Sequence, residues 1–368
     1  MKIEYSYDKH PMKWWHAPLI ILLVIGTIYA MLDNRKPGTA DTGKTVGKAW
    51  PQTDTQRCEG MVFGTFYHIT YQHPSRLDDS IKAVLSRVDG SLSPFNKASV
   101  ISAINSNADM KVDKMLAEVF SQSMKVSQET FGAFDITVMP LVNLWGFGFK
   151  NMDNVTPEMV DSLRQFVGTD KVKLNGSLIE KADPGVMLDC GAIAKGYGVD
   201  AVGRMLESAG VANYMVEIGG EVRLRGCNPR GLLWAIGVTK PQDDSLSLNR
   251  DIEQVIQTTD ISMATSGNYR NFYVKGGKKY AHTIDPRTGY PVQHSILSST
   301  VLADDCATAD AYATSFMVLG LDSARLVLDR HPELMAYFIY SASDGTTASW
   351  CSPRLEQMLG RTDDTARP

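Results

Sequence analysis

The sequence has few cysteines, no excess of positive charge and no internal repeat of fixed period. Five scattered cysteines without a CxxC pair exclude a disulfide scaffold and provide no zinc or thiol redox motif. The 37 Lys and Arg residues against 41 Asp and Glu residues give a net charge of −4. Because nucleic-acid binding depends largely on basic contacts to phosphates, we expect no nucleic-acid partner.

The remaining composition is that of a globular protein. Of the 368 residues, 43% are hydrophobic and 21% are charged, which excludes a disordered or fibrous chain. This length is sufficient for one large domain or two ordinary ones.

Residues 14–32 form an apolar stretch in which His16 is the only titratable group. A helix over this range spans roughly 30 Å, the thickness of the bilayer core, and Trp14, Trp15 and Tyr29 suit the two interfaces. The alternatives are a cleaved signal peptide and a buried helix. No small-residue cleavage site or lipid-accepting cysteine follows, so we expect one uncleaved transmembrane anchor after a short segment at 1–13. Basic residues on both sides leave its orientation open.

The chain after this stretch divides into a linker and a domain. Residues 33–57 are rich in Gly, Pro, Thr, Asp and Lys and have little to bury, so they predict a flexible linker. Residues 58–368 then form the globular domain. Its helical and strand patterns are mixed without a regular βαβ rhythm. We therefore expect one large α/β (mixed α+β) domain with two lobes and a ligand cleft between them.

The elements of this domain are predicted from the period of the apolar residues. Residues 58–71 read as one strand with Gly64 as a bend. Helices are expected at 76–88, 113–130 and 306–320, in a stretch that opens after Gly191, and in one that ends at Leu328. Strands are expected within 171–189 and at 214–218, 221–225, 234–238, 280–284, 298–302 and 335–340.

The first motif with chemical potential is DCGAIAKGYGVD at 189–200. Here an acidic residue ends a strand and glycines open a helix, an arrangement that exposes backbone N–H groups to a phosphate. The same glycines also fit ordinary turn chemistry.

A second motif covers residues 263–291 and includes Ser266, Arg270, His282 and Asp285. A hairpin at the GGKK segment would bring Arg270 close to His282. Asp285 begins a Pro-containing turn closed by Gly and fits a role in capping backbone amides. A lone strand histidine is also commonly a structural hydrogen-bond partner.

A third motif is the i, i+4 pair of Asp310 and Thr314, whose oxygens lie on one face of the predicted helix. Hard oxygen ligands of this kind suit Mg²⁺ completed by water and phosphates. Alternatively, Asp310 is a carboxylate in the first turn of the helix that the helix dipole stabilises, and the Thr314 hydroxyl bonds a backbone carbonyl of its own helix. A fourth stretch, the aromatic-rich 132–148 with Asp135, is consistent with core.

Taken together, these segments resemble one family. GAFDITVMPLVNLWGFG, LDCGAIAKGYGVD, YMVEIGGEVRLRG, TSGNYRNF, HTIDPRTGYPV and DCATADAYATSFMVLG occur in the order of the ApbE family of FAD:protein FMN transferases, from about Gly60 to Gly320. The resemblance implies an Mg²⁺-dependent enzyme that splits FAD, transfers FMN to a Thr or Ser hydroxyl of an acceptor flavoprotein, and releases AMP.

The resemblance also implies a site. Ala192, through its backbone carbonyl, Asp310 and Thr314 would hold Mg²⁺, and the polar catalytic side would comprise Ser266, Arg270 and His282. Phe63 and Phe95 differ from the common family residues but keep an apolar face for stacking on a ring. The full set of residues expected to contact the flavin nucleotide is Phe63, Phe95, Ala133, Phe134, Asp135, Asp189, Lys195, Glu217, Gly219, Gly220 and Ile284.

The family further implies a location and partners. Its members work outside the cytoplasmic membrane on subunits of Nqr- and Rnf-type electron-transfer complexes, so a single-pass anchor would keep this domain on the extracytoplasmic side beside its acceptors. Two other functions remain open: an Mg²⁺-dependent FAD pyrophosphatase, and a non-catalytic flavin-binding protein. The Asp310 and Thr314 pair favours an enzyme over the latter.

Overall fold

A computed structural model describes residues 43–148, 155–240, 252–267, 272–275, 278–281, 283–293 and 295–360. The predicted anchor at 14–32, residues 33–42 of the predicted linker, Arg270 and His282 lie outside these residues. Within the described ranges, none of the helices combines the length and apolarity needed to cross a bilayer.

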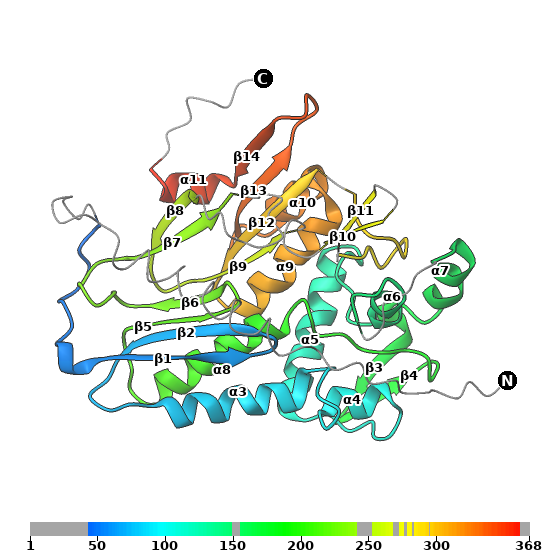
Figure 1. Cartoon of the computed structure of the whole chain (residues 1–368), viewed down its shortest axis with the longest axis horizontal. Coiled ribbons are helices and arrows are strands. Elements are labelled where there is room, and N and C mark those ends of the chain that lie inside the picture. Colours follow the sequence, from blue (N-terminus) through cyan, green and yellow to red (C-terminus); the bar gives the residue numbers. More distant parts are fainter. Residues whose placement is uncertain are drawn as a thin grey trace.

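An eight-stranded sheet organises the molecule, with strand order β1-β2-β5-β6-β9-β12-β13-β14 (Figure 1). Every pairing along it is antiparallel, which confirms a mixed α/β domain rather than a βαβ repeat. The strands are β1 (Thr55–Val62), β2 (Thr65–Gln72), β5 (Tyr214–Ile218), β6 (Glu221–Arg225), β9 (Ser262–Gly267), β12 (Ile296–Ala303), β13 (Met335–Ser341) and β14 (Thr347–Cys351). The division into two lobes stays a prediction.

The strand predicted at 58–71 is a hairpin. Val62 pairs with Thr65, so only Phe63 and Gly64 form the turn, with φ angles of 52° and 73°. Positive φ at both positions is the requirement of a type I′ hairpin turn, and Asn-Gly or Asp-Gly is its usual signal. A phenylalanine at the first position conceals this turn in the sequence.

Helices cover one face of the sheet, and α8 (Ala194–Ser208) and α9 (Cys306–Leu319) lie closest to it (Figure 1). Around them lie α3 (Asp78–Leu92), α5 (Lys114–Glu129) and α10 (Leu321–Arg330). Nearly all of α9 is buried, as expected for a helix that is apolar on all sides. At Gly196 a Cβ atom would lie 2.3 Å from the Cys306 carbonyl oxygen, so only glycine permits α8 and α9 to approach this closely.

The opposite face of the sheet is covered by a hairpin and a short helix. The hairpin consists of β7 (Trp234–Thr239) and β8 (Ile252–Thr258), and the helix is α11 (Pro353–Met358). Val238 and Ile256 of the hairpin pack with sheet residues such as Met263 and Leu302 in one buried cluster. The central strands of the sheet are therefore buried on both faces.

The smaller elements complete the domain. Figure 1 shows α6 and α7 on the far side of α5 from the sheet, with the hairpin β10–β11 above them. The β10–β11 pairing confirms the predicted hairpin around GGKK. The remaining bounds are α4 (Val100–Asn105), α6 (Met139–Leu144), α7 (Pro157–Arg164), β3 (Val172–Asn175), β4 (Leu178–Lys181), β10 (Phe272–Lys275), β11 (Lys278–Ala281) and the 3₁₀ turns η2 (Gln52–Asp54) and η3 (Thr169–Lys171).

The domain begins earlier than the predicted boundary at residue 58. Trp50 is only 7% exposed and its ring meets that of Trp234 edge-on at 5.9 Å. Thr45 forms a bridge with Leu232, and β1 starts at Thr55. This corrects the C-terminal part of the predicted linker: one buried tryptophan anchors an otherwise polar segment, because a Trp side chain buries a large apolar area.

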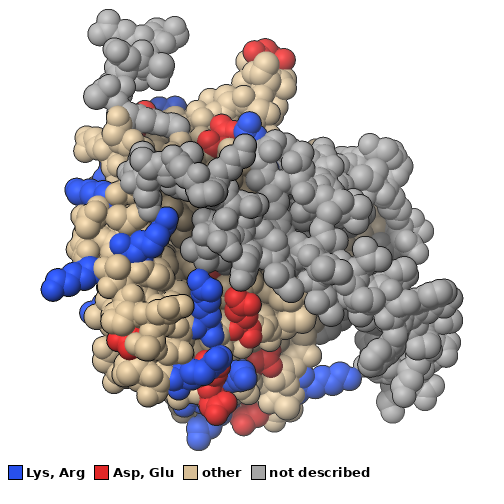
Figure 2. All heavy atoms as spheres, turned by 60° about the vertical axis from the view of Figure 1, so that its left-hand side comes forward, with Lys and Arg blue, Asp and Glu red and all other residues tan. Residues whose placement is uncertain are grey.

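The described surface carries mixed charge. Figure 2 shows basic and acidic side chains next to one another on the lower part of the face turned forward. On that part of the surface neither sign forms a continuous patch.

Candidate functional site

The start of α8 is held by a partly buried turn. Asp189 accepts a hydrogen bond from the Gly191 N–H at 2.7 Å, while its own N–H donates to the Ile136 carbonyl. Burial raises the pKa of the Asp189 carboxyl. The carboxylate thus fixes the turn that leads from residue 189 into the helix. The prediction that Asp189 ends a strand is wrong, because β4 (Leu178–Lys181) ends earlier and Met187 forms only an isolated bridge with Val138.

A cavity of about 400 Å³ opens beside this turn. Phe95 is 67% exposed at its edge, and the Phe63 ring lies so close to α8 that a Cβ atom at Gly198 would come within 2.8 Å of it. The lining residues are Phe63, Gly64, Val88, Asp89, Leu92, Ser93, Pro94, Phe95, Asn96, Cys190, Gly191 and Ala194. Aromatic rings beside a helix N-terminus suit a ligand with a flat ring and a phosphate.

A buried charged cluster lies one residue further along α8. Lys195 Nζ is 2.7 Å from Glu221 Oε1 and 3.6 Å from Asp310 Oδ1. Asp310 also accepts a hydrogen bond from the Gly196 N–H at 3.0 Å. Ala194 lines the cavity, and the next two residues, Lys195 and Gly196, belong to the cluster. The N-terminus of α8 therefore connects the cavity to this cluster.

Charge and burial oppose one another in this cluster. Burial disfavours the Lys195 ammonium, but Asp310 and Glu221 outweigh it and raise the pKa of Lys195. Burial, against the attraction of Lys195, raises the pKa of Glu221 to about 7. The sequence interpretation missed Glu221. Arg223, two residues later on β6, faces α8 and contacts Asp200. Because alternate residues of a strand share a face, this pattern could have placed Glu221 on the helix side of the sheet.

Thr314 and Ser266 meet beyond Asp310. Their hydroxyl oxygens are 2.9 Å apart, because α9 packs along β9. The structure therefore brings together three residues that were predicted from separate motifs: Asp310, Thr314 and Ser266.

The turn between β5 and β6 is shaped by two glycines. Gly219 and Gly220 have φ angles of 64° and 106°. Glu217 accepts a hydrogen bond from the Gly220 N–H at 2.6 Å and contacts His68 Nδ1 at 2.7 Å, a contact that raises the pKa of His68. The Glu217 carboxylate is engaged within the protein and holds the turn. The N–H groups of Gly219 and Gly220 are also engaged, since Gly219 donates to the Phe66 carbonyl and Gly220 to Glu217.

Four further predicted residues have side chains that lie in the interior or bond locally. Ala133 and Phe134 are buried in the main core, and Ile284 is buried in a smaller cluster with Leu141 and Trp145. Asp135 accepts hydrogen bonds from the Thr137 N–H and hydroxyl. None of the four lines the cavity beside α8. An aromatic-rich stretch has the same pattern whether it forms core or a binding site, so the sequence does not separate the two.

The oxygen donors near Asp310 fit Mg²⁺ bound together with a phosphate. Asp310 and Thr314 lie one turn apart on α9, and Ala192 belongs to the turn before α8. Among the described residues no group of three or more His, Cys, Asp or Glu side chains is placed to hold a metal. Mg²⁺ commonly uses only one or two carboxylates and takes its other ligands from water and substrate phosphates, which is the donor set present here.

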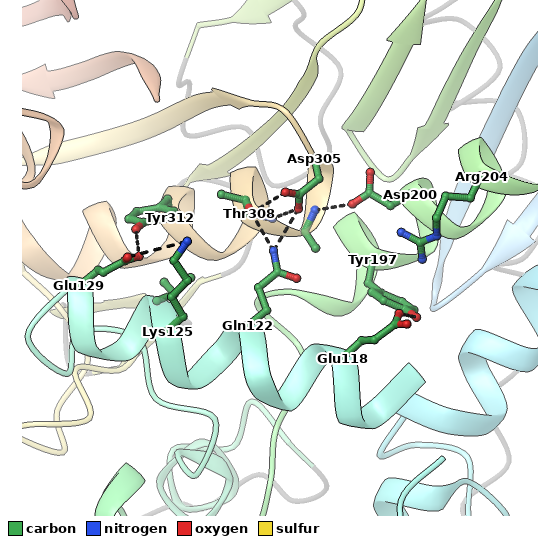
Figure 3. A pocket seen from close by; sticks show the side chains of 12 residues that line it. Glu118, Gln122, Lys125, Glu129, Tyr197, Asp200, Arg204, Asp305, Thr308 and Tyr312 are labelled. Carbon is green, nitrogen blue, oxygen red and sulfur yellow. Dashed lines mark hydrogen bonds and ion pairs between the residues drawn. The ribbon is translucent and has the colours of Figure 1, made fainter. Parts of the chain in front are cut away.

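A second cavity, of about 460 Å³, lies between α5, α8 and α9 (Figure 3). Its carboxylates already have partners: Tyr197 donates to Glu118 at 2.5 Å and Tyr312 donates to Glu129. Gln122 donates across the cavity to Asp305 and Thr308. This second cavity is larger and more polar than the first, and its acidic groups are paired within the protein.

Fold and site together define an α/β protein with an aromatic pocket and a helix N-terminus beside a cluster of two carboxylates and a lysine. The family model described as the ApbE family matches residues 63–338, well over half of the chain, and the chain therefore belongs to the ApbE family.

Relatives and solved structures agree with this assignment. The chain is 37% identical over 311 residues to the FAD:protein FMN transferase of Haemophilus influenzae, covering 80% of this chain and 89% of the relative. It is 30% identical to that of Escherichia coli K12, covering 92% and 97%. Its fold is similar to the flavin transferase ApbE from Vibrio cholerae (TM-score 0.74, 34% identity, 82% of this chain and 98% of that one) and to the flavinyl transferase ApbE from Pseudomonas stutzeri (TM-score 0.74, 28% identity, 83% and 97%).

Proposed function

We propose that this protein is an Mg²⁺-dependent FAD:protein FMN transferase. The relatives named above carry this activity in their names. The observation that carries the proposal for this chain is the continuity of the aromatic cavity, the N-terminus of α8 and the Lys195–Asp310 cluster. This arrangement offers, in order, places for a flavin ring, a diphosphate and a divalent cation.

The described residues take the following roles in the proposal. Phe63 and Phe95 contact the flavin ring, and the N–H groups at the start of α8 together with Lys195 bind the diphosphate. Asp310, Thr314 and the Ala192 carbonyl hold Mg²⁺. When bound, the metal neutralises charge on the phosphate oxygens and favours departure of the AMP half.

The transfer is a displacement at phosphorus. The hydroxyl oxygen of an acceptor Thr or Ser forms a bond to the phosphorus of the FMN half, the bond from this phosphorus to the bridging oxygen breaks, and AMP leaves with that oxygen. His282 accepts the hydroxyl proton, with Arg270 and Ser266 on the same polar side. Ser266 is already oriented by its contact with Thr314.

The acceptor and location complete the proposal. Residues 14–32 anchor the enzyme in the cytoplasmic membrane as a single span with the domain on the extracytoplasmic side. The acceptors are flavoprotein subunits of Nqr- or Rnf-type complexes, whose effective concentration rises when enzyme and acceptor share one membrane.

The test uses the full chain with FAD, MgCl₂ and an acceptor protein that contains a candidate flavinylation Thr. We expect a fluorescent acceptor band that survives a denaturing gel, and release of AMP in equal amount. A Thr→Ala acceptor is the matched control and stays dark. Release of free FMN and AMP without a labelled acceptor would instead establish a pyrophosphatase and contradict the proposal.

A further inference from the structure

A partly buried lysine lies between two buried carboxylates that come from different elements. Lys195 belongs to the first turn of α8, Glu221 begins β6 and Asp310 lies within α9. Glu221 and Asp310 are each only 2% exposed. Three parts of the chain that are distant in sequence thus place one ammonium group beside two carboxylates.

The lysine ammonium group lies closer to one of these carboxylates than to the other. Its Nζ atom hydrogen-bonds Glu221 Oε1 at 2.7 Å, whereas Asp310 Oδ1 is 3.6 Å away, beyond ordinary hydrogen-bond distance. Asp310 instead accepts its short hydrogen bond from the backbone at Gly196. Glu221 therefore holds the ammonium group by a hydrogen bond, and Asp310 Oδ1 has that group only at the longer distance of an ion pair.

A second observation at Glu221 points in the same direction. Its other oxygen, Oε2, is buried and has no hydrogen-bond partner. Leaving a buried carboxylate oxygen unpaired is costly. The hydrogen bonds that Glu221 makes therefore do not by themselves account for a carboxylate at this position. Two carboxylates against one ammonium also leave the cluster short of positive charge, which favours entry of a further cation.

We propose that Glu221 is a positioning residue that holds the Lys195 ammonium group away from Asp310 and so keeps Asp310 available to a divalent cation. This inference rests on the proposed role of Asp310 as an Mg²⁺ ligand. Lysine has a long flexible stem and a compact charge. Without the negative charge at position 221, the ammonium group would move closer to Asp310, donate a hydrogen bond to its carboxylate and compete with the metal.

The experiment measures binding of Mg²⁺ alone to the full chain by titration calorimetry. Glu221→Gln keeps the size of the side chain but removes its charge, and we expect it to weaken Mg²⁺ binding about tenfold, the scale of groups that act through a metal ligand. In the double variant Glu221→Gln/Lys195→Met the competing ammonium is gone, so affinity returns toward that of the parent. Glu221→Asp keeps the charge and restores binding in part.

The matched control is Glu207→Gln. Glu207 also links α8 to β6 through ion pairs, with Arg223 and Arg225, but contacts neither Lys195 nor Asp310. We expect its Mg²⁺ affinity to equal that of the parent, which separates the proposed role from general weakening of the contact between α8 and β6.

Two results would overturn the inference: unchanged Mg²⁺ affinity in Glu221→Gln, or a loss that persists in the double variant. Failure of the proposed function is distinguishable. If flavin transfer proceeds in the parent while Glu221→Gln binds Mg²⁺ normally, only this inference fails. If the calorimetric pattern holds while no acceptor is labelled, the transferase proposal fails and the role of Glu221 stands.

Discussion

The two cavities next to α8 differ in how their polar groups are partnered. In the larger one, between α5, α8 and α9, tyrosine hydroxyls bond Glu118 and Glu129, and Gln122 bridges to α9. The smaller one has an exposed aromatic residue at its edge. It adjoins a cluster in which Glu221 Oε2 is buried without a partner.

This difference indicates where a ligand adds the most interaction free energy. In the larger cavity a ligand must first displace hydrogen bonds that the protein already makes, at a cost similar to the gain. In the smaller cavity a flat ring covers exposed apolar surface, and a cation offsets charge that is already buried. The two cavities are similar in size and differ in how their polar groups are partnered, and the following variants test that comparison.

The largest contrast is expected between Asp310→Ala and Glu129→Gln. Loss of Asp310 removes the only carboxylate among the proposed metal ligands, and transfer activity should fall about 10³-fold, since a bound metal stabilises the transition state by several kcal/mol. Glu129→Gln changes the larger cavity, between α5, α8 and α9, and should leave transfer activity within about twofold of that of the parent. Steady-state assays with circular dichroism as a check on folding measure both. Equal activity of the two variants would contradict the metal assignment.

The next contrast concerns how stability depends on pH. Because the pKa of Glu221 is raised from 4.5 to about 7, the folded protein retains a proton that the unfolded chain loses in this range. The stabilisation is complete below the unfolded pKa and is lost as the pH rises through 7. As the pH rises from 4 to 8, the free energy of unfolding of Glu221→Gln should therefore increase relative to that of the parent, by about 3 kcal/mol at most.

Glu207→Gln provides the opposite sign. Burial works against ionisation of Glu207, but Tyr214, Arg223 and Arg225 outweigh it and lower the pKa of this carboxyl. Its contribution is present above the unfolded pKa, so this variant should lose stability relative to the parent as the pH rises. Urea titrations across the range measure both slopes, and slopes of the same sign would refute the distinction between the two carboxylates.

A smaller effect, roughly 10²-fold in rate, is expected for His282→Ala if this histidine is the general base. The control is His331→Ala, because His331 contacts the Tyr312 ring near the paired cavity and bonds Glu333. The comparison is made on kcat with saturating FAD. A negligible effect of His282→Ala would make this residue structural.

The smallest contrast pairs two exposed phenylalanines. Phe95→Ala removes a stacking surface and should raise KM for FAD about tenfold, as base–aromatic stacking contributes roughly 1–3 kcal/mol. Phe131, which is also exposed but lies against Arg330, should tolerate Ala without a change in KM. If both variants change KM alike, the smaller cavity does not hold the ring.

Much of the fold was predictable because its elements have strong periodicity. The expected strands at 214–218 and 221–225 coincide with β5 and β6, and the expected helix at 306–320 with α9. The hairpin at Phe63 and the anchoring of Trp50 were not predictable. One is a turn made by an atypical residue and the other a packing contact with a strand distant in sequence.

The sequence by itself determined the strongly periodic elements, the family and the pairing of Asp310 with Thr314, because helical spacing and motif order are local properties of the chain. Only the tertiary structure decided that Ser266 meets Thr314 and that Ala133, Phe134 and Ile284 belong to the interior. It also decided that Glu221 holds Lys195 beside Asp310. These relations depend on which faces of distant elements pack together, and burial converts that packing into the electrostatics of the site.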